Sequence, residues 1–233
     1  MDAAAETAAN HQAGRKTAGL VAAWAALGAT ALTLVVAAGY LDRLDDSVRS
    51  LVAAARSPAG IRFMTAVSHL GSEYATLPVV LGLAYWMGRR HRLFARHFIV
   101  VALTSPVWQI VLKRVVGRPR PWPPLLSYWH GLGYPSGHVL NAASIALFLV
   151  LYLAHVAHHE EHRTPHRVGR GLRGAYAALF TWPILMAVSR VYVDAHWAMD
   201  VVGGLALGLL HVASWYYLLG WRLPVRVSGD ISS

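Results

Sequence analysis

Long apolar stretches without a charged residue alternate along this chain with short polar segments. The first stretch, residues 17–41, has 25 residues without a charge, and the last, residues 201–221, has 21. A helix that crosses a bilayer needs about 20 apolar residues, so each stretch is long enough for one transmembrane helix. The first stretch is too long for the core of a typical cleaved signal peptide, and further apolar stretches follow it. We therefore expect it to be the first membrane span.

Shorter apolar stretches between these two supply the remaining predicted spans. Residues 74–88, 97–112 and 174–189 form charge-free runs of 15, 16 and 16 residues. At 1.5 Å per residue, 16 helical residues cover about 24 Å, less than a hydrocarbon core of about 30 Å, so flanking Lys and Arg side chains must reach outward to the interface. Residues 139–154 form a further span after a loop rich in Pro, Trp and Gly at 121–135. The pattern therefore predicts six spans.

The segment between the first two predicted spans, residues 42–70, mixes charged with apolar residues. Apolar residues recur in it at helical spacing: Val48, Leu51, Val52 and Ala55. This pattern predicts a helix that lies in the membrane interface rather than across it, and Ser57-Pro58 should break it. The predicted fold is therefore all-α and polytopic, with six transmembrane helices plus an interfacial helix between spans one and two. We expect a disordered cytoplasmic tail at 1–16, one six-helix membrane domain at 17–222 and a cytoplasmic tail at 223–233.

Composition excludes an ordinary soluble enzyme and a disordered chain. Hydrophobic residues make up 56% of the sequence and charged residues only 14%, whereas soluble domains carry about 25% charged residues. The net charge of +10 would indicate nucleic acid in a soluble protein. In a membrane protein such charge fixes the topology, so we expect no nucleic-acid partner. The sequence has no cysteine, which excludes disulfides and thiolate metal sites.

The Lys and Arg residues between the predicted spans indicate the orientation in the membrane. If the N-terminus is cytoplasmic, the inner segments carry 12 Lys and Arg and the outer segments carry 9. Five of those nine lie in a cluster that has a chemical explanation, given below: Lys113, Arg114, Arg118, Arg120 and Arg190. Without that cluster the count is 12 against 4, and the positive-inside rule places both termini in the cytoplasm.

Three segments carry more chemistry than a topology signal needs. They are Lys113 to Pro121 at the end of the third span, Pro135 to His138 at the start of the fourth, and Ser189 to Asp200 between the fifth and sixth. With six spans, all three fall on the same, outer side of the membrane. Because this side was not used to choose the spans, their co-location points to one site.

The charges in these segments are suited to phosphate. Lys113, Arg120 and Arg190 supply positive charge near the bilayer surface, and they would repel one another unless an anion lay among them. Arginine binds two oxygens of one phosphate through its planar guanidinium. Ser136 and Gly137 stand where a helix begins, and the free N–H groups of a helix start also bind phosphate.

Two histidines accompany these cations. His196 and Asp200 are four residues apart and share one face of a helix, so the carboxylate can hold one ring nitrogen protonated and leave the other as a lone pair. This is the logic of a catalytic triad applied to a histidine that attacks directly. His138 would be the proton donor to the leaving oxygen. The clustered cations would stabilise the transferred phosphoryl group, so we expect no metal and no cofactor.

The order and spacing of the motifs, K-x6-R-P, P-S-G-H and S-R-x5-H-x3-D, resemble the signature of the type-2 phosphatidic acid phosphatase superfamily. The resemblance covers about half of the chain, from the third span to the sixth. It implies a six-helix membrane lipid phosphatase with a phosphohistidine intermediate. By position, the nucleophile is His196, its partner is Asp200 and the general acid is His138. The implied phosphate-binding residues are Lys113, Arg120, Ser136, Gly137 and Arg190.

The predicted function is therefore metal-independent hydrolysis of a lipid phosphomonoester or pyrophosphate at the outer face of the cytoplasmic membrane. Undecaprenyl pyrophosphate, phosphatidylglycerophosphate and phosphatidic acid are the candidate substrates, and the bilayer is the expected partner. Two alternatives use the same site: a lipid phosphotransferase, and a non-catalytic phospholipid-binding membrane protein or transporter. Transporters often carry inverted repeats, and no clear internal repeat is visible here. Related haloperoxidases hold vanadate in such a site, but they are soluble.

Some residues near the motifs have less specific roles. Arg114 and Arg118 are interpreted as supporting charges or lipid anchors. Asp194 either balances the cationic site or faces water. The histidine-rich stretch at 155–166 favours a solvated loop over a metal site.

One further pattern concerns packing rather than chemistry. Gly204 and Gly208 form a G-x3-G pattern in the last span. Such a pattern allows two helix backbones to approach closely, and we expect this contact within the bundle.

Overall fold

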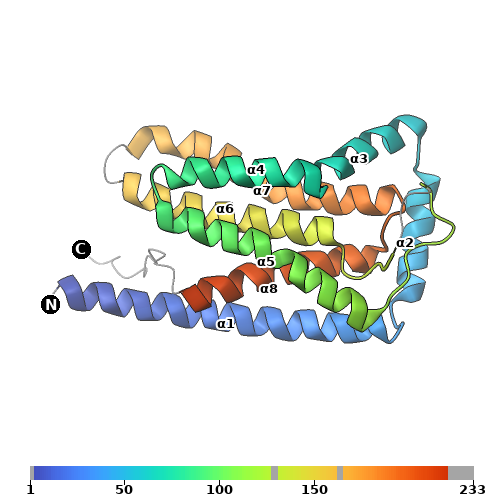
Figure 1. The fold of residues 1–233 in the computed structure, drawn as a ribbon, viewed down its shortest axis with the longest axis horizontal. Helices are drawn as coiled ribbons and strands as arrows, with labels where there is room; N and C mark the ends of the chain where they lie inside the picture. The colour runs from blue at the N-terminus through green and yellow to red at the C-terminus, as the bar shows by residue number, and fades with distance from the viewer. Residues whose placement is uncertain (1–2, 127–130, 162–164, 220–233) are drawn as a thin grey trace, which may run out of the picture.

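The computed structural model describes residues 3–126, 131–161 and 165–219. In these ranges the chain forms eight helices and no strand, only an isolated bridge between Pro119 and Leu132. Seven helices run along a bundle or extend from its end, and α2 crosses that end (Figure 1). The helices are α1 Ala3–Ala37, α2 Asp42–Ala54, α3 Pro58–Leu70, α4 Glu73–Gly88, α5 Arg92–Val116, α6 Gly137–Glu161, α7 Pro165–Tyr192 and α8 Ala198–Leu219.

Five of the helices are long and apolar enough to cross a membrane. They contain the segments Gly19–Ala37, Arg92–Val116, Gly137–Ala157, Gly171–Tyr192 and Ala198–Leu218. These segments coincide with the first, third, fourth, fifth and sixth predicted spans. Large apolar side chains such as those of Trp24, Leu103 and Phe180 point outward with 71%, 68% and 61% of their surface exposed. Such an apolar surface is suited to lipid, and it confirms a multi-pass membrane protein.

The remaining predicted span, residues 74–88, corresponds to α4. This helix has only 16 residues and is therefore too short to be identified as a span by length. It lies beside α5 in the bundle (Figure 1), with Val80 and Ala84 buried. The all-helical fold is confirmed, whereas the number of six spans stays a prediction.

The N-terminal tail differs from its prediction, and the C-terminal tail is not among the described residues. Helix α1 begins at Ala3, so the expectation that residues 1–16 are disordered is wrong from Ala3 onward. Alanine is abundant there and has the highest intrinsic helix propensity, which allows the membrane helix to extend toward the N-terminus. The C-terminal tail expected at 223–233 lies outside the described residues.

The segment expected to lie in the interface forms two helices, α2 and α3. Ser57 ends the first and caps the second, since its Oγ accepts a hydrogen bond of 3.1 Å from the N–H of Gly60. Pro58 occupies the first turn of α3, where its missing N–H costs nothing. The predicted break at Ser57-Pro58 is confirmed, and α2 lies across the end of the bundle (Figure 1).

The histidine-rich stretch is mostly helical. Helix α6 continues to Glu161 and α7 begins at Pro165. His155, His158 and His159 therefore belong to α6, and the expectation of a loop over 155–166 is wrong there. Residues 162–164 lie outside the described part of the chain.

Close packing of α6 against α8 sets the position of the functional motifs. A Cβ atom at Gly204 would lie 2.8 Å from the carbonyl oxygen of Ser136, and one at Gly208 would lie 2.6 Å from Cβ of Ala143. The role predicted for the G-x3-G pattern, close contact within the bundle, is confirmed. The contact places the start of α6 beside the start of α8, where the N–H of Ser136 donates to the carbonyl oxygen of Asp200 over 2.9 Å.

Candidate active site

Four helix ends meet at one end of the bundle, beside α2 (Figure 1). They are the C-terminal ends of α5 and α7 and the N-terminal ends of α6 and α8. These ends, with the loops that join them, carry the three sequence motifs. Segments 113–121, 135–138 and 189–200, far apart in the sequence, therefore lie together.

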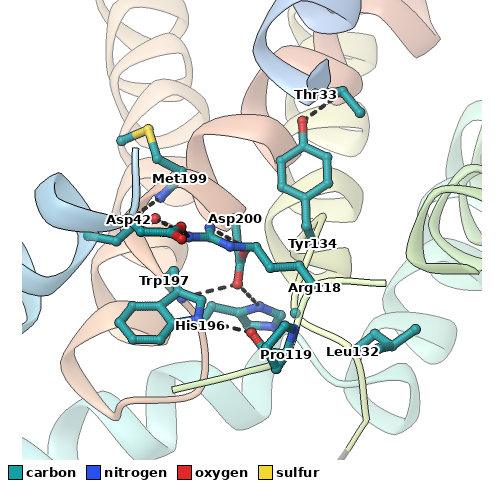
Figure 2. Close-up of polar contacts among 12 residues, drawn as sticks. Thr33, Asp42, Arg118, Pro119, Leu132, Tyr134, His196, Trp197, Met199 and Asp200 are labelled. Atoms are coloured by element: carbon teal, nitrogen blue, oxygen red, sulfur yellow. Dashed lines mark hydrogen bonds and ion pairs between the residues drawn. The ribbon is translucent and has the colours of Figure 1, made fainter. Parts of the chain in front are cut away.

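The central element of the site is a buried histidine–carboxylate pair (Figure 2). His196 Nδ1 lies 3.2 Å from Asp200 Oδ2, and the two residues are 2% and 0% exposed. The N–H of Trp197 donates to the same oxygen over 3.1 Å. Because a carboxylate only accepts, His196 donates from Nδ1, and its Nε2 keeps the lone pair.

The surroundings of His196 favour its neutral form. Burial, followed by the positive charges of Arg190, Arg120 and Lys113, lowers the pKa of His196 well below its ordinary value of 6.5. An imidazole with this environment is uncharged at neutral pH. It can therefore act as a nucleophile without first losing a proton.

Arg120 lies at the free ring nitrogen of His196. Its Nη1 is 3.3 Å from His196 Nε2 and donates to the carbonyl oxygen of Ala195 over 2.7 Å. Burial lowers the pKa of Arg120, which nevertheless stays charged. Its buried Nε has no hydrogen-bond partner in the described part of the chain. A cation with an unused donor thus stands where a group attacked by Nε2 would arrive.

Lys113 and Arg190 each donate hydrogen bonds to groups that belong to none of the three motifs. Lys113 Nζ donates to the carbonyl oxygens of Leu132 and Gly133, at 2.6 and 3.3 Å. Arg190 is 1% exposed, and its Nη1 donates to the hydroxyl of Ser68 in α3. These contacts bring both charges close enough to act on His196.

Ser136 and Gly137 form the tight start of α6. The Oγ of Ser136 is buried without a hydrogen-bond partner among the described residues. At Gly137 a Cβ atom would overlap the side-chain oxygen of Gln109. Glycine therefore lets the amide of Gln109 in α5 lie against the first turn of α6.

His138 lies one residue further along α6, at the edge of an apolar groove. The groove has a volume of about 230 Å³ and lies between α4, α6 and α7; beside His138 it is lined by Leu70, Val79, Ile145 and Trp182, among others. A Cβ atom at Gly71 would lie 3.1 Å from Cδ2 of His138. His138 therefore stands between the polar site and a surface suited to an alkyl chain.

Arg118 is a buried arginine that pairs with three carboxylates. It is 9% exposed, so the lipid-anchor interpretation is wrong and the supporting-charge interpretation is closer. It donates to Asp200 Oδ1 over 3.2 Å, to Asp45 Oδ2 over 2.6 Å and to Asp42 Oδ1 over 2.9 Å. Burial lowers the pKa of Arg118, but the hydrogen bond to Asp45 and the charge of Asp200 together raise it above its ordinary value.

Asp194 is also buried, at 3% exposure, so it does not face water. Arg49 of α2 binds it through two hydrogen bonds of 2.9 and 2.7 Å, and Arg56 binds it over 3.1 Å. Both arginines are among the four outer positive charges that entered the sequence analysis only as topology signals. No local pattern could have paired them with a residue more than a hundred positions away.

Comparison with known proteins identifies the family. The model of the PAP2 superfamily matches residues 94–224, more than half of the chain. The chain belongs to the PAP2 superfamily. This confirms the family that the three motifs predict.

Individual relatives of this PAP2 protein come from Bacillus subtilis and Aquifex aeolicus. Phosphatidylglycerophosphatase B of Bacillus subtilis (strain 168) is 28% identical over 185 residues, which cover 77% of this chain and 85% of that protein. The crystal structure of a transmembrane PAP2 type phosphatidylglycerolphosphate phosphatase from Bacillus subtilis has a TM-score of 0.66 and 25% identity, covering 81% of this chain and 92% of that one. Aquifex aeolicus LpxE shares the fold, with a TM-score of 0.56 and 24% identity over 74% of this chain and 94% of its own.

Proposed function

We propose that this protein hydrolyses the phosphate group of a membrane lipid through a phosphohistidine at His196. Membership of the PAP2 superfamily and likeness to bacterial phosphatases support a lipid phosphatase. The observation that carries the mechanism is the buried His196, held at Nδ1 by Asp200 and facing Arg120 at Nε2.

The phosphate of the substrate binds among the cations. Arg120 Nε and Ser136 Oγ are buried polar atoms without a partner among the described residues. Such atoms are rare in native proteins, and two oxygens of one phosphate would satisfy them. Lys113 and Arg190 supply further positive charge, and Gly137 stands at the start of α6, where free N–H groups bind phosphate.

In the first step His196 Nε2 attacks phosphorus in line with the lipid oxygen. The P–N bond forms while the bond between phosphorus and that oxygen breaks. His138 donates a proton to the leaving oxygen, and Asp200 stabilises the positive imidazole. Arg120 lies beside the phosphoryl oxygens and stabilises the charge that spreads over them.

In the second step water replaces the histidine. His138, now neutral, takes a proton from a water molecule, whose oxygen attacks phosphorus. The P–N bond breaks, inorganic phosphate leaves, and both histidines return to their starting state. This cycle uses only side chains of the chain, and the cationic donor set of Lys113, Arg120 and Arg190 disfavours a divalent metal ion at the phosphate.

The groove beside His138 supports a lipid substrate. Because His138 protonates the leaving oxygen, the lipid part of the substrate must extend from that side of the phosphate. The apolar groove between α4, α6 and α7 begins there. Phosphatidylglycerophosphate is the first substrate to test, because the Bacillus subtilis relatives carry that activity in their names; undecaprenyl pyrophosphate and phosphatidic acid are the others.

The test is phosphate release from these three lipids by the purified protein in detergent. We expect release by the wild type with and without EDTA, and none by His196→Ala that elutes like the wild type in size-exclusion chromatography. Full activity of that variant, or strict dependence on added Mg²⁺, would contradict the mechanism. Transfer of labelled phosphate to another lipid instead of water would identify a phosphotransferase.

A further inference from the structure

Asp200 is held from two sides, and only one of these belongs to the predicted catalytic pair (Figure 2). Its Oδ2 accepts from His196 and from the N–H of Trp197. Its Oδ1 accepts from Arg118 Nη1 over 3.2 Å. Because Asp200 is 0% exposed, no water competes for these contacts, and Arg118 fixes the rotation of the carboxylate that faces His196.

Arg118 is itself fixed by Asp45 of α2. Asp45 is 1% exposed and accepts from Arg118 Nη2 over 2.6 Å through Oδ2. Its other oxygen, Oδ1, accepts from the N–H of Met199 over 2.9 Å. Met199 directly precedes Asp200, so the bonds close a ring from Asp45 through Arg118 and Asp200 and back along the chain to Asp45.

This ring does not bind phosphate. Both terminal nitrogens of Arg118 donate to carboxylates, whereas Arg120 keeps a buried donor without a partner in the described residues. Arg118 also lies over the ring of Trp197, 5.6 Å from its centre. It therefore acts through Asp200 rather than on the substrate.

We propose that Arg118 and Asp45 are positioning residues, which hold Asp200 in the orientation that presents the lone pair of His196 Nε2 to the substrate. The assignment rests on the proposed function and adds to it. It gives α2, which carries no family motif, an indirect part in the reaction through Asp200. Without Arg118, Oδ1 of the buried carboxylate would lose its partner, and the carboxylate could rotate relative to His196.

The proposal predicts a specific kinetic defect. In Arg118→Ala, kcat should fall about 10- to 100-fold, the loss typical when a residue that orients a functional histidine is removed. KM should change less than about threefold, because the phosphate contacts remain. Asp45→Asn should show a smaller loss of the same kind, since its amide oxygen can accept from only one of the two donors, Arg118 and the N–H of Met199. The matched control is Arg43→Ala, which removes an exposed arginine of α2 and should keep wild-type kinetics.

Chemical rescue distinguishes positioning from a structural role. A cavity of about 350 Å³ lies beside Arg118, lined by Asp42, Asp45, Gly117 and Trp197, among others. Guanidinium ions at millimolar concentration can enter it and bind between Asp45 and Asp200. We expect them to raise the kcat of Arg118→Ala about tenfold and to leave that of Arg43→Ala unchanged. Absence of rescue in a folded, impaired Arg118→Ala variant would indicate a structural role and overturn the proposal.

The remaining outcomes separate this assignment from the proposed function. A wild type that releases phosphate, combined with normal kcat in Arg118→Ala and Asp45→Asn, refutes the positioning role alone. A wild type that releases no phosphate from any of the three lipids refutes the proposed function, and the positioning role with it. If Arg118→Ala aggregates, folded Asp45→Asn decides: lowered kcat at unchanged KM supports the proposal, and unchanged kcat contradicts it.

Discussion

The imidazole of His196 has two different neighbours, Asp200 at Nδ1 and Arg120 at Nε2, 3.2 and 3.3 Å away. The carboxylate fixes the tautomer, and the guanidinium marks where a phosphoryl group would be bound. Burial and the nearby cations keep this histidine neutral. The chemistry of the site thus follows from the surroundings of one side chain.

The lowered pKa of His196 predicts how activity depends on pH. The attacking form is neutral, so it is present above the pKa of His196 and lost as the pH falls through it. Since that pKa lies well below 6.5, kcat/KM should hold as the pH falls from about 7 to about 6, apart from protonation of the substrate. The phosphate pKa of the substrate, measured by ³¹P NMR, supplies the correction. A loss of kcat/KM centred at 6.5 or above after this correction would count against a neutral, buried nucleophile.

At the scale of elements, α2 joins the catalytic helices by buried ion pairs. Asp45 reaches Arg118 from the first turn of α2, and Arg49 reaches Asp194 from its middle. Arg49 also donates to the carbonyl oxygens of Trp122 and Pro123 in the loop after α5. The helix therefore holds the loops that carry Arg120 and His196.

Removing the charge of Asp194 should loosen this attachment. Asp194 has a φ of +60°, a conformation that asparagine tolerates as well as aspartate, so Asp194→Asn changes the charge and not the backbone. Removing the negative charge that Arg49 and Arg56 share should cost about 2 to 4 kcal/mol. The thermal unfolding midpoint in detergent should fall by several degrees, while Asp46→Asn, an exposed change on α2, should leave it unaltered. An unchanged midpoint in Asp194→Asn would mean that these ion pairs do not stabilise the fold.

The helices of this chain are predictable from its sequence, whereas many of the contacts between them are not. The first and last apolar stretches, 17–41 and 201–221, were long enough to identify helices, and three motifs identified the family. Asp45 gave no such signal, because an acidic residue in the first turn of a helix is favoured by the helix dipole alone. Its partner Arg118 lies 73 positions away, and pairing at that distance depends on the folded bundle.

At the scale of the whole molecule, the site lies at the opposite end of the bundle from the start of α1 (Figure 1). With the positive-inside count, this arrangement supports our proposal that the site faces outward from the cytoplasmic membrane and that both termini are cytoplasmic. The turn after α4, which includes Arg90, lies at the far end from the site.

Cysteine labelling tests this orientation, because the sequence contains no cysteine of its own. Leu44 is exposed on α2, so Leu44→Cys should react with a membrane-impermeant maleimide on intact cells. Arg90→Cys, in the exposed turn at the other end, should react only after the membrane is permeabilised. The reverse pattern would place the site on the cytoplasmic side.

The central claim is that His196 carries the phosphoryl group during turnover. An aryl phosphate with a good leaving group needs no acid in the first step, so His138→Ala should form the phosphoenzyme and hydrolyse it slowly. Mass spectrometry after alkaline handling should then find phosphate on the peptide that contains His196, and none when His196→Ala is added to His138→Ala. Phosphate on a different residue, or turnover without any phosphorylated peptide, would contradict the account.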